Sequence, residues 1–314
     1  MTTYIIRRLL GMIPTVLIVG IIAFVLVHLS PGDPTAFFLG PDAPPGAVEE
    51  MRQRLGLDDP LPVQFVQWFG LVLQGDLGLS LHRQQPVLYL FWRALPPSVY
   101  LTLTALALAV VLGVFVGIVS AIKQDSWFDK FTTLFVLTGL AVPNFWLAML
   151  LIMIFSLGLG WLPVQGFVNP FDDFWEGVRR LLLPSIALGY AAAALIARMA
   201  RSSMLDVLRQ DFIRTARGKG VPERSVIYKH GLRNALNNVL TVIGLVLVSL
   251  LSGNIVIELV FNYPGVGRLV VDAVFRRDYP LIQGSLMLVA LITIIMNLLI
   301  DITYSLVDPR IVYE

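Results

Sequence analysis

Six long apolar segments constrain the fold of this chain more than any other feature. In lipid only a helix satisfies its backbone groups within one segment, and about 20 residues cross the hydrocarbon core. Hydrophobic residues make up 57% of the 314 and charged residues only 14%, about half the charged share of a soluble domain. We therefore predict an all-α polytopic membrane protein, a single domain over residues 1–314, with six transmembrane helices. They are expected at Leu9–Ser30, Val99–Ile122, Phe131–Leu157, Leu181–Ala200, Leu236–Ile257 and Leu281–Leu306.

The distribution of Lys and Arg predicts the orientation. The first apolar segment follows Arg7 and Arg8, as in a signal peptide, but it is too long for one and has no small-x-small cleavage site after it, so we expect it to stay. With the N-terminus inside, the cytoplasmic side also receives Lys123, Lys130, Arg310 and the basic segment 201–235. Both termini are therefore predicted to be cytoplasmic.

Residues 31–97 then form an external cap segment, and residues 258–281 a second external segment. The cap is rich in Pro, Gly and Asp, yet Gly46–Gly56 and Pro62–Gln74 have apolar residues at helical spacing. Two short helices are expected there, and the Trp-bearing second one is suited to the outer membrane interface.

Small residues recur every fourth position in the second and fourth spans, a pattern that lets helices approach closely. The ridges pack either within the chain or against another subunit. They consist of Ala105, Ala109, Gly113, Gly117 and Ala121, and of Ser185, Gly189, Ala193 and Ala197. In the third span, Pro143 is expected to kink the helix, and Asn144 either satisfies the freed carbonyls or lines a path.

Several function classes lack the residues they need. The chain has no Cys, and its three His fall on opposite sides of the predicted membrane, so no metal site is expected. No zinc-protease, serine-hydrolase or phosphate-loop motif is present, which disfavours a membrane enzyme. No charge lies at mid-depth of a span, which disfavours an ion-coupled secondary transporter or channel.

The basic segment 201–235 reads as a helical hairpin fixed to a span at each end. Ser202 or Ser203 could cap a helix from near Met204, and Gly218 and Gly220 would end it. Its apolar face is expected to hold Leu205, Leu208, Phe212 and Ala216. Pro222 would start a second helix that leads into the fifth span.

Three interpretations of this basic hairpin compete. Its attachment to the membrane argues against DNA binding, and contact with anionic lipid is the simplest alternative. The third is docking: Arg214, Arg217, Lys219 and Arg224 suit an acidic-rimmed groove on a cytoplasmic motor, which could then tilt the fourth and fifth spans.

At these residues the chain resembles the permeases of ABC importers. Thr215–Gly220 is similar to their EAA loop, in the form of the dipeptide/oligopeptide/nickel branch. Arg214 stands where the general motif has Glu, and His230–Arg233 replaces its I-x-L-P. Both departures are similar to that branch, whose K-H-x-L-R-N-A pattern matches Lys229–Ala235. Further resembling segments are His28–Pro34, Gly75–Ser80, Pro143–Trp146, Leu183–Gly189, Arg201–Leu208, Val260–Val274, Arg276–Gly284 and Asp308–Ile311. Together they are typical of the B-type permease.

The resemblance implies a type I (MetI-like) fold and a machine of several chains in a prokaryotic cytoplasmic (inner) membrane. It implies a C-type permease, two ATP-binding subunits that hold ATP and Mg, and an extracytoplasmic solute-binding protein. This chain would bind no cofactor and no nucleic acid, would not be an enzyme, and would import small peptides by alternating access. Glutathione, nickel chelates and sugars are carried by relatives of the branch.

Three sets of site residues follow. For ATPase coupling we expect Asp211, Arg214, Thr215, Ala216, Arg217, Gly218, Lys219, Gly220, His230, Arg233 and Asn234. For the translocation path we expect Asn144, Thr241, Ser249, Ser252, Asn254 and Glu258, mostly on the fifth span by family analogy. For an external gate or binding-protein dock we expect Pro264, Gly265, Gly267, Arg268, Arg276, Arg277 and Asp278.

Overall fold

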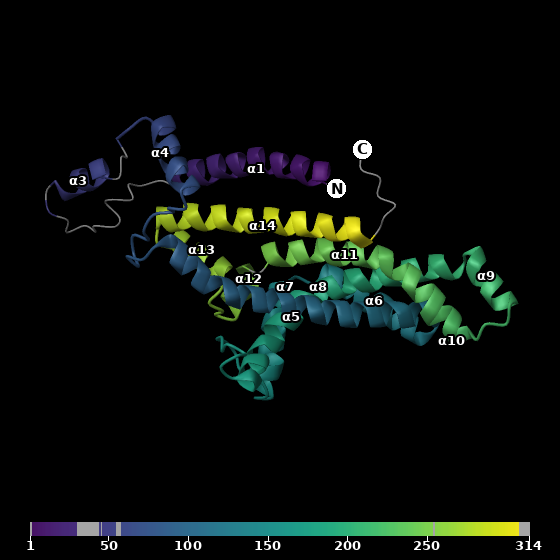
Figure 1. Cartoon of the computed structure of the whole chain (residues 1–314). Coiled ribbons are helices and arrows are strands. Elements are labelled where there is room, and N and C mark those ends of the chain that lie inside the picture. Colours follow the sequence, from purple (N-terminus) through teal and green to yellow (C-terminus); the bar gives the residue numbers. More distant parts are fainter. Residues whose placement is uncertain (1, 30–43, 45, 55–57, 254, 308–314) are drawn as a thin grey trace. The chain divides into compact units, whose positions relative to one another are not determined.

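The described part of the chain is helical throughout, apart from turns and one isolated bridge between Leu79 and Pro86. The computed structural model describes residues 2–29, 44, 46–54, 58–253 and 255–307. Its α-helices are α1 (Thr2–His28), α3 (Ala47–Arg54), α4 (Leu61–Leu73), α5 (Val87–Ile122), α6 (Trp127–Ala141), α7 (Asn144–Leu151), α8 (Phe174–Leu208), α9 (Asp211–Gly218), α10 (Glu223–Ser225), α11 (Leu232–Gly253), α12 (Ile255–Val260), α13 (Val266–Phe275) and α14 (Tyr279–Val307) (Figure 1). Two π-helices, η1 (Ile152–Gly158) and η2 (Val226–Gly231), continue α7 and α10.

The chain divides into two compact units. The first takes its residues from Met1–Pro96 and Gly265–Leu298, and the second from Pro97–Pro264 and Leu299–Val312. Helix α5 begins in the first unit and continues into the second, so the cap segment predicted to end at residue 97 already contains the first turns of a helix.

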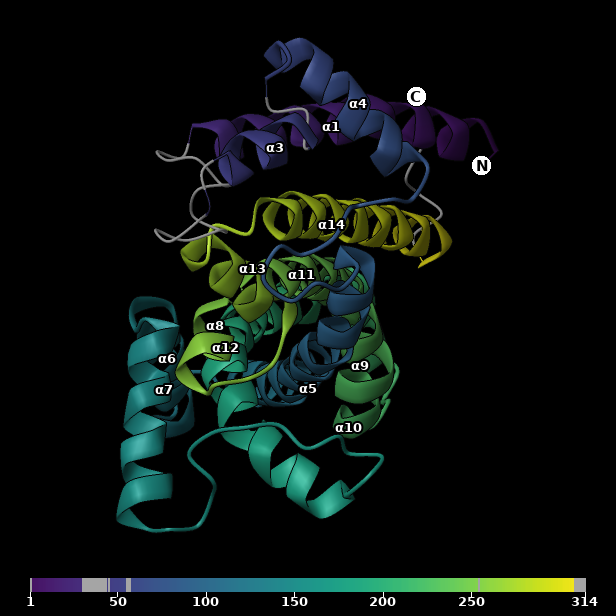
Figure 2. The ribbon, with the colours of Figure 1, turned by 90° about the vertical axis from the view of Figure 1, so that its left-hand side faces the viewer.

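Helix α8 is the centre of the second unit. Its most apolar window is 67% buried, and it packs against α6, α7 and α11 (Figure 2). The small-residue ridges meet here: a Cβ added to Gly113 would lie 2.8 Å from the carbonyl oxygen of Ala193, and one on Gly189 would lie 2.7 Å from that of Ala105. Of the two alternatives, the structure shows packing within the chain, and glycine is what allows the backbones to approach this closely.

The third predicted span is broken rather than kinked. Helix α6 ends at Ala141, α7 begins at Asn144, and the two axes differ by 108°. Val142 and Pro143 both adopt extended backbone, since the proline ring disfavours helix in the residue before it. The expected single kinked helix over Phe131–Leu157 is therefore wrong.

The membrane spans partly match the predicted six. Among the described residues four helices are long and apolar enough to cross a membrane, or five if α6 and α7 form one broken span. Helix α1 contributes a shorter apolar stretch, Leu10–Leu26, about 26 Å at 1.5 Å per residue against about 30 Å of hydrocarbon. The sixth complete span remains a prediction.

The first unit contains the two helices expected in the cap, α3 and α4. Helix α4 packs on α1 through a cluster of rings formed by Phe24, His28, Phe65, Trp68 and Phe69. Gly20 of α1 makes room for this contact, because a Cβ there would lie 2.9 Å from the Phe69 ring. A second apolar cluster joins the start of α5 to α13 and α14.

Candidate coupling surface

The basic hairpin forms where α8 ends. Helix α8 continues through Ser202 and Ser203 to Leu208, so the prediction that a new helix begins near Met204 is wrong. The hairpin helix α9 begins at Asp211, with Gln210 as its N-cap. Gly220 ends the hairpin's first arm at φ +74°, a backbone conformation that favours glycine. After Pro222 the chain continues through α10 and η2 into α11, as predicted (Figure 1).

Ile213 is the main anchor of α9, and Ala216 packs beside it. Ile213 is fully buried, whereas Phe212, which we expected on the apolar face, is 40% exposed. The other predicted members of that face, Leu205, Leu208 and Ala216, do pack against the core. Phe212 does not, because α9 is a separate helix after the Arg209–Gln210 turn, and the turn rotates its apolar face relative to α8. Ile213 packs in a cluster, here called the hairpin core, that comprises Ala121, Met204, Val207, Ile213, Val226 and Ala235.

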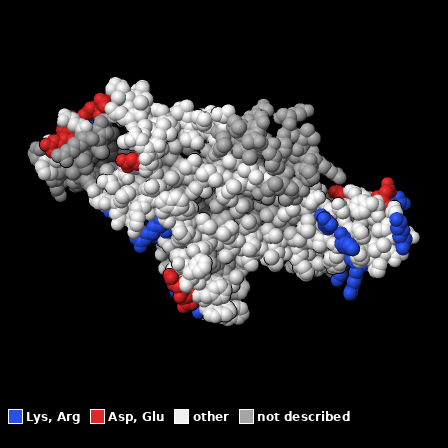
Figure 3. Space-filling model, viewed as in Figure 1, with Lys and Arg blue, Asp and Glu red and all other residues white. Residues whose placement is uncertain are grey.

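The outer surface of α9 is polar and open. Basic side chains gather over the end of the second unit that carries α9 and α10 (Figure 3). Of the predicted coupling residues, His230 and Ala216 are half-buried. The exposed ones are Asp211, Arg214, Thr215, Arg217, Gly218, Lys219, Gly220, Arg233 and Asn234.

Arg217 links the two arms of the hairpin. Its Nε and Nη2 donate to the Glu223 carboxylate at 3.1 and 2.7 Å, and this bonding raises the pKa of Arg217. Arg214 makes a looser pair with Asp211 at 3.8 Å. The fork between Arg217 and Glu223 fixes the turn and leaves α9 presented to a partner.

The predicted path residues do not share one environment. Thr241 and Ser249 are exposed on α11 with Leu245 between them, which places them on one face at i, i+4 and i+8. Asn144 is half-buried in the first turn of α7. The side chain of Ser252 and the whole of Asn254 lie outside the described residues.

Glu258 is buried rather than open to a path. It has no exposed surface and accepts a hydrogen bond of 2.6 Å from the Ser98 hydroxyl. Tyr263, also fully buried, lies nearby, and its hydroxyl has no hydrogen-bond partner among the described residues. Burial raises the pKa of Tyr263, and the negative charge of Glu258 raises it further. Sequence reasoning missed Ser98 and Tyr263, since neither carries a charge.

The predicted gate residues are distributed along α13 and its two ends. Pro264 and Gly265 precede α13, and Arg268 pairs with Asp272 at 3.8 Å on its surface. Arg276 is exposed, and Arg277 adopts φ +53° in the turn before α14. Gly267 is half-buried in the first turn.

Asp278 is the buried charged residue among the predicted gate residues. It is 1% exposed and accepts hydrogen bonds from the Ser80 hydroxyl and from the backbone N–H of Leu81 (3.1 Å) and His82 (3.4 Å). The His82 ring bonds the Arg276 carbonyl at 3.2 Å. The loop that follows α4 is thus fastened to the start of α14, a connection between two motifs that the sequence showed only separately.

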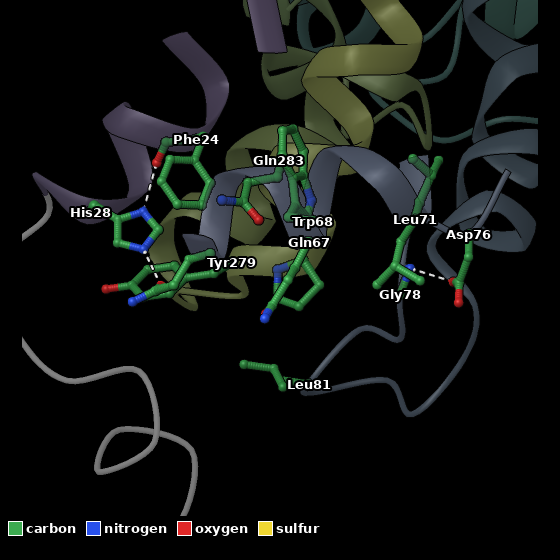
Figure 4. Close-up of a pocket in the computed structure, with 13 residues that line it drawn as sticks. Phe24, His28, Gln67, Trp68, Leu71, Asp76, Gly78, Leu81, Tyr279 and Gln283 are labelled. Atoms are coloured by element: carbon green, nitrogen blue, oxygen red, sulfur yellow. Dashed lines mark hydrogen bonds between the residues drawn. The ribbon is translucent and has the colours of Figure 1, made fainter. Parts of the chain in front are cut away.

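A cavity of about 230 Å³ lies beside this loop, between α1, α4 and the start of α14 (Figure 4). Aromatic and aliphatic side chains dominate its walls, together with the amides of Gln64, Gln67 and Gln283. None of the thirteen described residues that line it is Lys or Arg. Among the residues that the structure describes, no group of His, Asp and Glu could hold a metal ion.

Comparison with known proteins agrees with this helical architecture. Residues 113–313 match the family described as "Binding-protein-dependent transport system inner membrane component", and residues 1–102 match the corresponding N-terminal family. The chain is 44% identical to the dipeptide transport system permease protein DppB of Alkalihalophilus pseudofirmus. It is 45% and 46% identical to the glutathione transport system permease protein GsiC of Escherichia coli K12 and Salmonella typhimurium. Each alignment covers 100% of both chains.

Solved structures support the fold alone. A chain of the inward-facing MetNI methionine ABC transporter superposes with a TM-score of 0.58 at 16% identity, covering 70% of this chain and 97% of that one. An amino acid ABC transporter gives a TM-score of 0.50 at 17% identity over 71% and 94%.

Proposed function

This chain belongs to the family of binding-protein-dependent transport system inner membrane components, and from that premise we propose that it is the B-type permease of a peptide importer. It is a multi-pass inner-membrane ABC importer permease with an all-α, MetI-like fold. Its 44–46% identity to permeases named for dipeptide and glutathione transport supports a small peptide as cargo. Glutathione, a nickel chelate or a sugar is the alternative cargo.

The observation that carries the proposal is the presentation of α9. A short helix with an open polar surface is anchored by the buried Ile213 and joined to α10 by the Arg217–Glu223 fork. A helix that is fixed in place and presents its charged side chains outward is suited to docking in a groove of another protein. The partner would be an ATP-hydrolysing subunit, since this chain has no phosphate-loop motif.

The proposed importer needs four further chains. Two ATP-binding subunits supply ATP and Mg, a C-type permease supplies the other wall of the path, and a solute-binding protein delivers cargo. In this arrangement both termini and the hairpin lie in the cytoplasm, and residues 31–97 and 258–281 lie outside.

In this proposal, alternating access is driven through α9 and α11. ATP binding brings the docked ATPase subunits together and so favours one arrangement of the two permeases. ATP hydrolysis lets the subunits separate and returns the permeases to the other arrangement. The movement enters at α9 and reaches α11 through η2. The exposed face with Thr241 and Ser249 on α11 would line the path between the permeases.

The test is purification of the chain from its native membrane in mild detergent, followed by identification of its companions by mass spectrometry. A second permease and one or two ATPases are the expected result. Ala216→Asp and Gly220→Glu should leave the chain in the membrane but abolish uptake. A chain that purifies alone, or wild-type uptake by both variants, would overturn the proposal.

A further inference from the structure

A buried carboxylate holds three helices together beside the hairpin. Asp129 of α6 is 5% exposed and accepts two bonds from Arg201 of α8, from Nε at 2.7 Å and from Nη2 at 2.8 Å. It also accepts hydrogen bonds from the Ser120 hydroxyl on α5 and from the Asp125 backbone N–H at 3.1 Å. We call Ser120, Asp129 and Arg201 the clamp.

The clamp adjoins the hairpin core in two places. Ser120 precedes Ala121, and Arg201 lies three residues, nearly one helical turn, before Met204. Both Ala121 and Met204 pack in the cluster that anchors Ile213 of α9. A displacement of α9 therefore reaches the clamp through side chains that are already in contact.

Helices α5 and α8 each contribute residues to the hairpin core, whereas α6 contributes none of its described residues. The start of α6 is therefore tied to that core through the clamp, in addition to the packing of α6 along α8. Asp129 lies in the first turn of α6, whose N-cap is Ser126. Beyond α6 lies the 108° break that leads to α7.

Stability alone does not account for such a group. A buried ion pair often contributes little net stability relative to an apolar replacement, because desolvation of the two charges offsets their attraction. What a bidentate pair does impose is one relative position of its two helices. The clamp should therefore matter for how the helices move together.

From the geometry we infer that Ser120, Asp129 and Arg201 are positioning residues that make α5, α6, α8 and the hairpin move as one body when an ATPase moves α9. The inference rests on the proposed function, which supplies the ATPase. Without the clamp, only packing such as that of Gly139 on Ala194 and the Thr138–Tyr190 hydrogen bond would hold α6 to α8, and the start of α6 could shift relative to the hairpin.

The variants must remove the clamp without leaving one buried charge unpaired, since that alone could unfold the chain. Asp129→Asn with Arg201→Gln removes both charges and keeps polar groups of similar size. The matched control is Glu176→Gln with Arg180→Gln, which removes an ion pair of 2.8 Å that lies within α8 and joins no two helices. Asp129→Glu, which keeps the charge, should restore part of the coupling.

The primary readout is a distance between spin labels in the assembled importer. The chain has no Cys, so two introduced cysteines are the only labelling sites on it. They are Gln210→Cys, next to α9, and Leu134→Cys, on the exposed side of α6. In the wild type and the control, the distance should be the same without nucleotide and with ATP trapped by vanadate. In the clamp variant it should change on addition of ATP.

A second readout is the stimulation of ATP hydrolysis by the solute-binding protein. It should fall about 5-fold or more in the clamp variant, the lower range of typical coupling between sites, while unstimulated hydrolysis persists. The inference is overturned if ATP changes the label distance in the wild type, or if the clamp variant behaves like the control. If the purified complex holds no ATPase, the proposed function fails first, and the inference fails with it.

Discussion

The Ser80 hydroxyl donates a hydrogen bond to the Asp278 carboxylate across 198 residues of sequence, and both side chains are buried. Ser80 lies in the loop between α4 and α5, and Asp278 directly precedes α14. Two segments predicted to face the outside thus share one hydrogen-bonded centre within the first unit. A carboxylate that accepts several donors in a buried site is costly to remove, because each donor then loses its partner.

Asp278→Ala should destabilise this loop by about 1.5–3 kcal/mol, the contribution of a hydrogen bond to a charged group. Arg83, exposed in the same loop, should become more sensitive to trypsin, as followed by gel or mass spectrometry. Asp272→Ala removes an exposed partner of Arg268 at 3.8 Å and should cost at most about 1 kcal/mol. Equal cleavage at Arg83 in both variants would show that Asp278 does not hold the loop.

Ile213→Ala should destabilise the hairpin by about 2–5 kcal/mol, because it empties the centre of a buried cluster. Phe212→Ala, one residue earlier and 40% exposed, is the control and should change stability far less. Thermal unfolding of the purified chain and its retention of an ATPase subunit measure the two effects. A larger loss from Phe212→Ala would restore the face that the sequence first suggested.

Gly117→Leu should prevent close packing of α5 on α8, since a Cβ at this position would overlap the Ala197 carbonyl oxygen. Overpacking typically costs about 1–3 kcal/mol, and backbone contact places this variant at the upper end. Gly11→Leu is the control, because nothing lies within 4 Å of a Cβ added there. Size-exclusion profiles in detergent should show aggregation of the first variant and a single peak for the second.

Arg217→Ala should separate docking from folding. The Arg217–Glu223 pair is exposed, so its loss should change stability by less than about 1 kcal/mol. Binding of the ATPase should weaken about tenfold or more, as expected for an arginine at the centre of an interface. Titration of the labelled ATPase into detergent-solubilised permease measures this, with Arg209→Ala at the end of α8 as the control. Unchanged affinity would remove Arg217 from the docking surface.

Local signals predicted much of the architecture. Apolar length predicted helices near all six segments, and family resemblance of the hairpin motif predicted the importer class. The end of α9 at Gly218 and the helix after Pro222 were also predicted, since glycine and proline act through their own backbone preferences. The polar, outward position of Arg214 and Arg217 followed from charge alone.

The sequence by itself determined which segments are helical and apolar, because hydrophobic length and breaker residues act within one segment. Only the tertiary structure decided which polar groups meet: Asp129 with Arg201, Ser80 with Asp278, and Ser98 with Glu258. It also decided that Ile213 rather than Phe212 anchors α9, and that Pro143 separates two helices. These outcomes depend on which helices lie beside one another and on how turns rotate them, and neither is encoded in the spacing of a single segment.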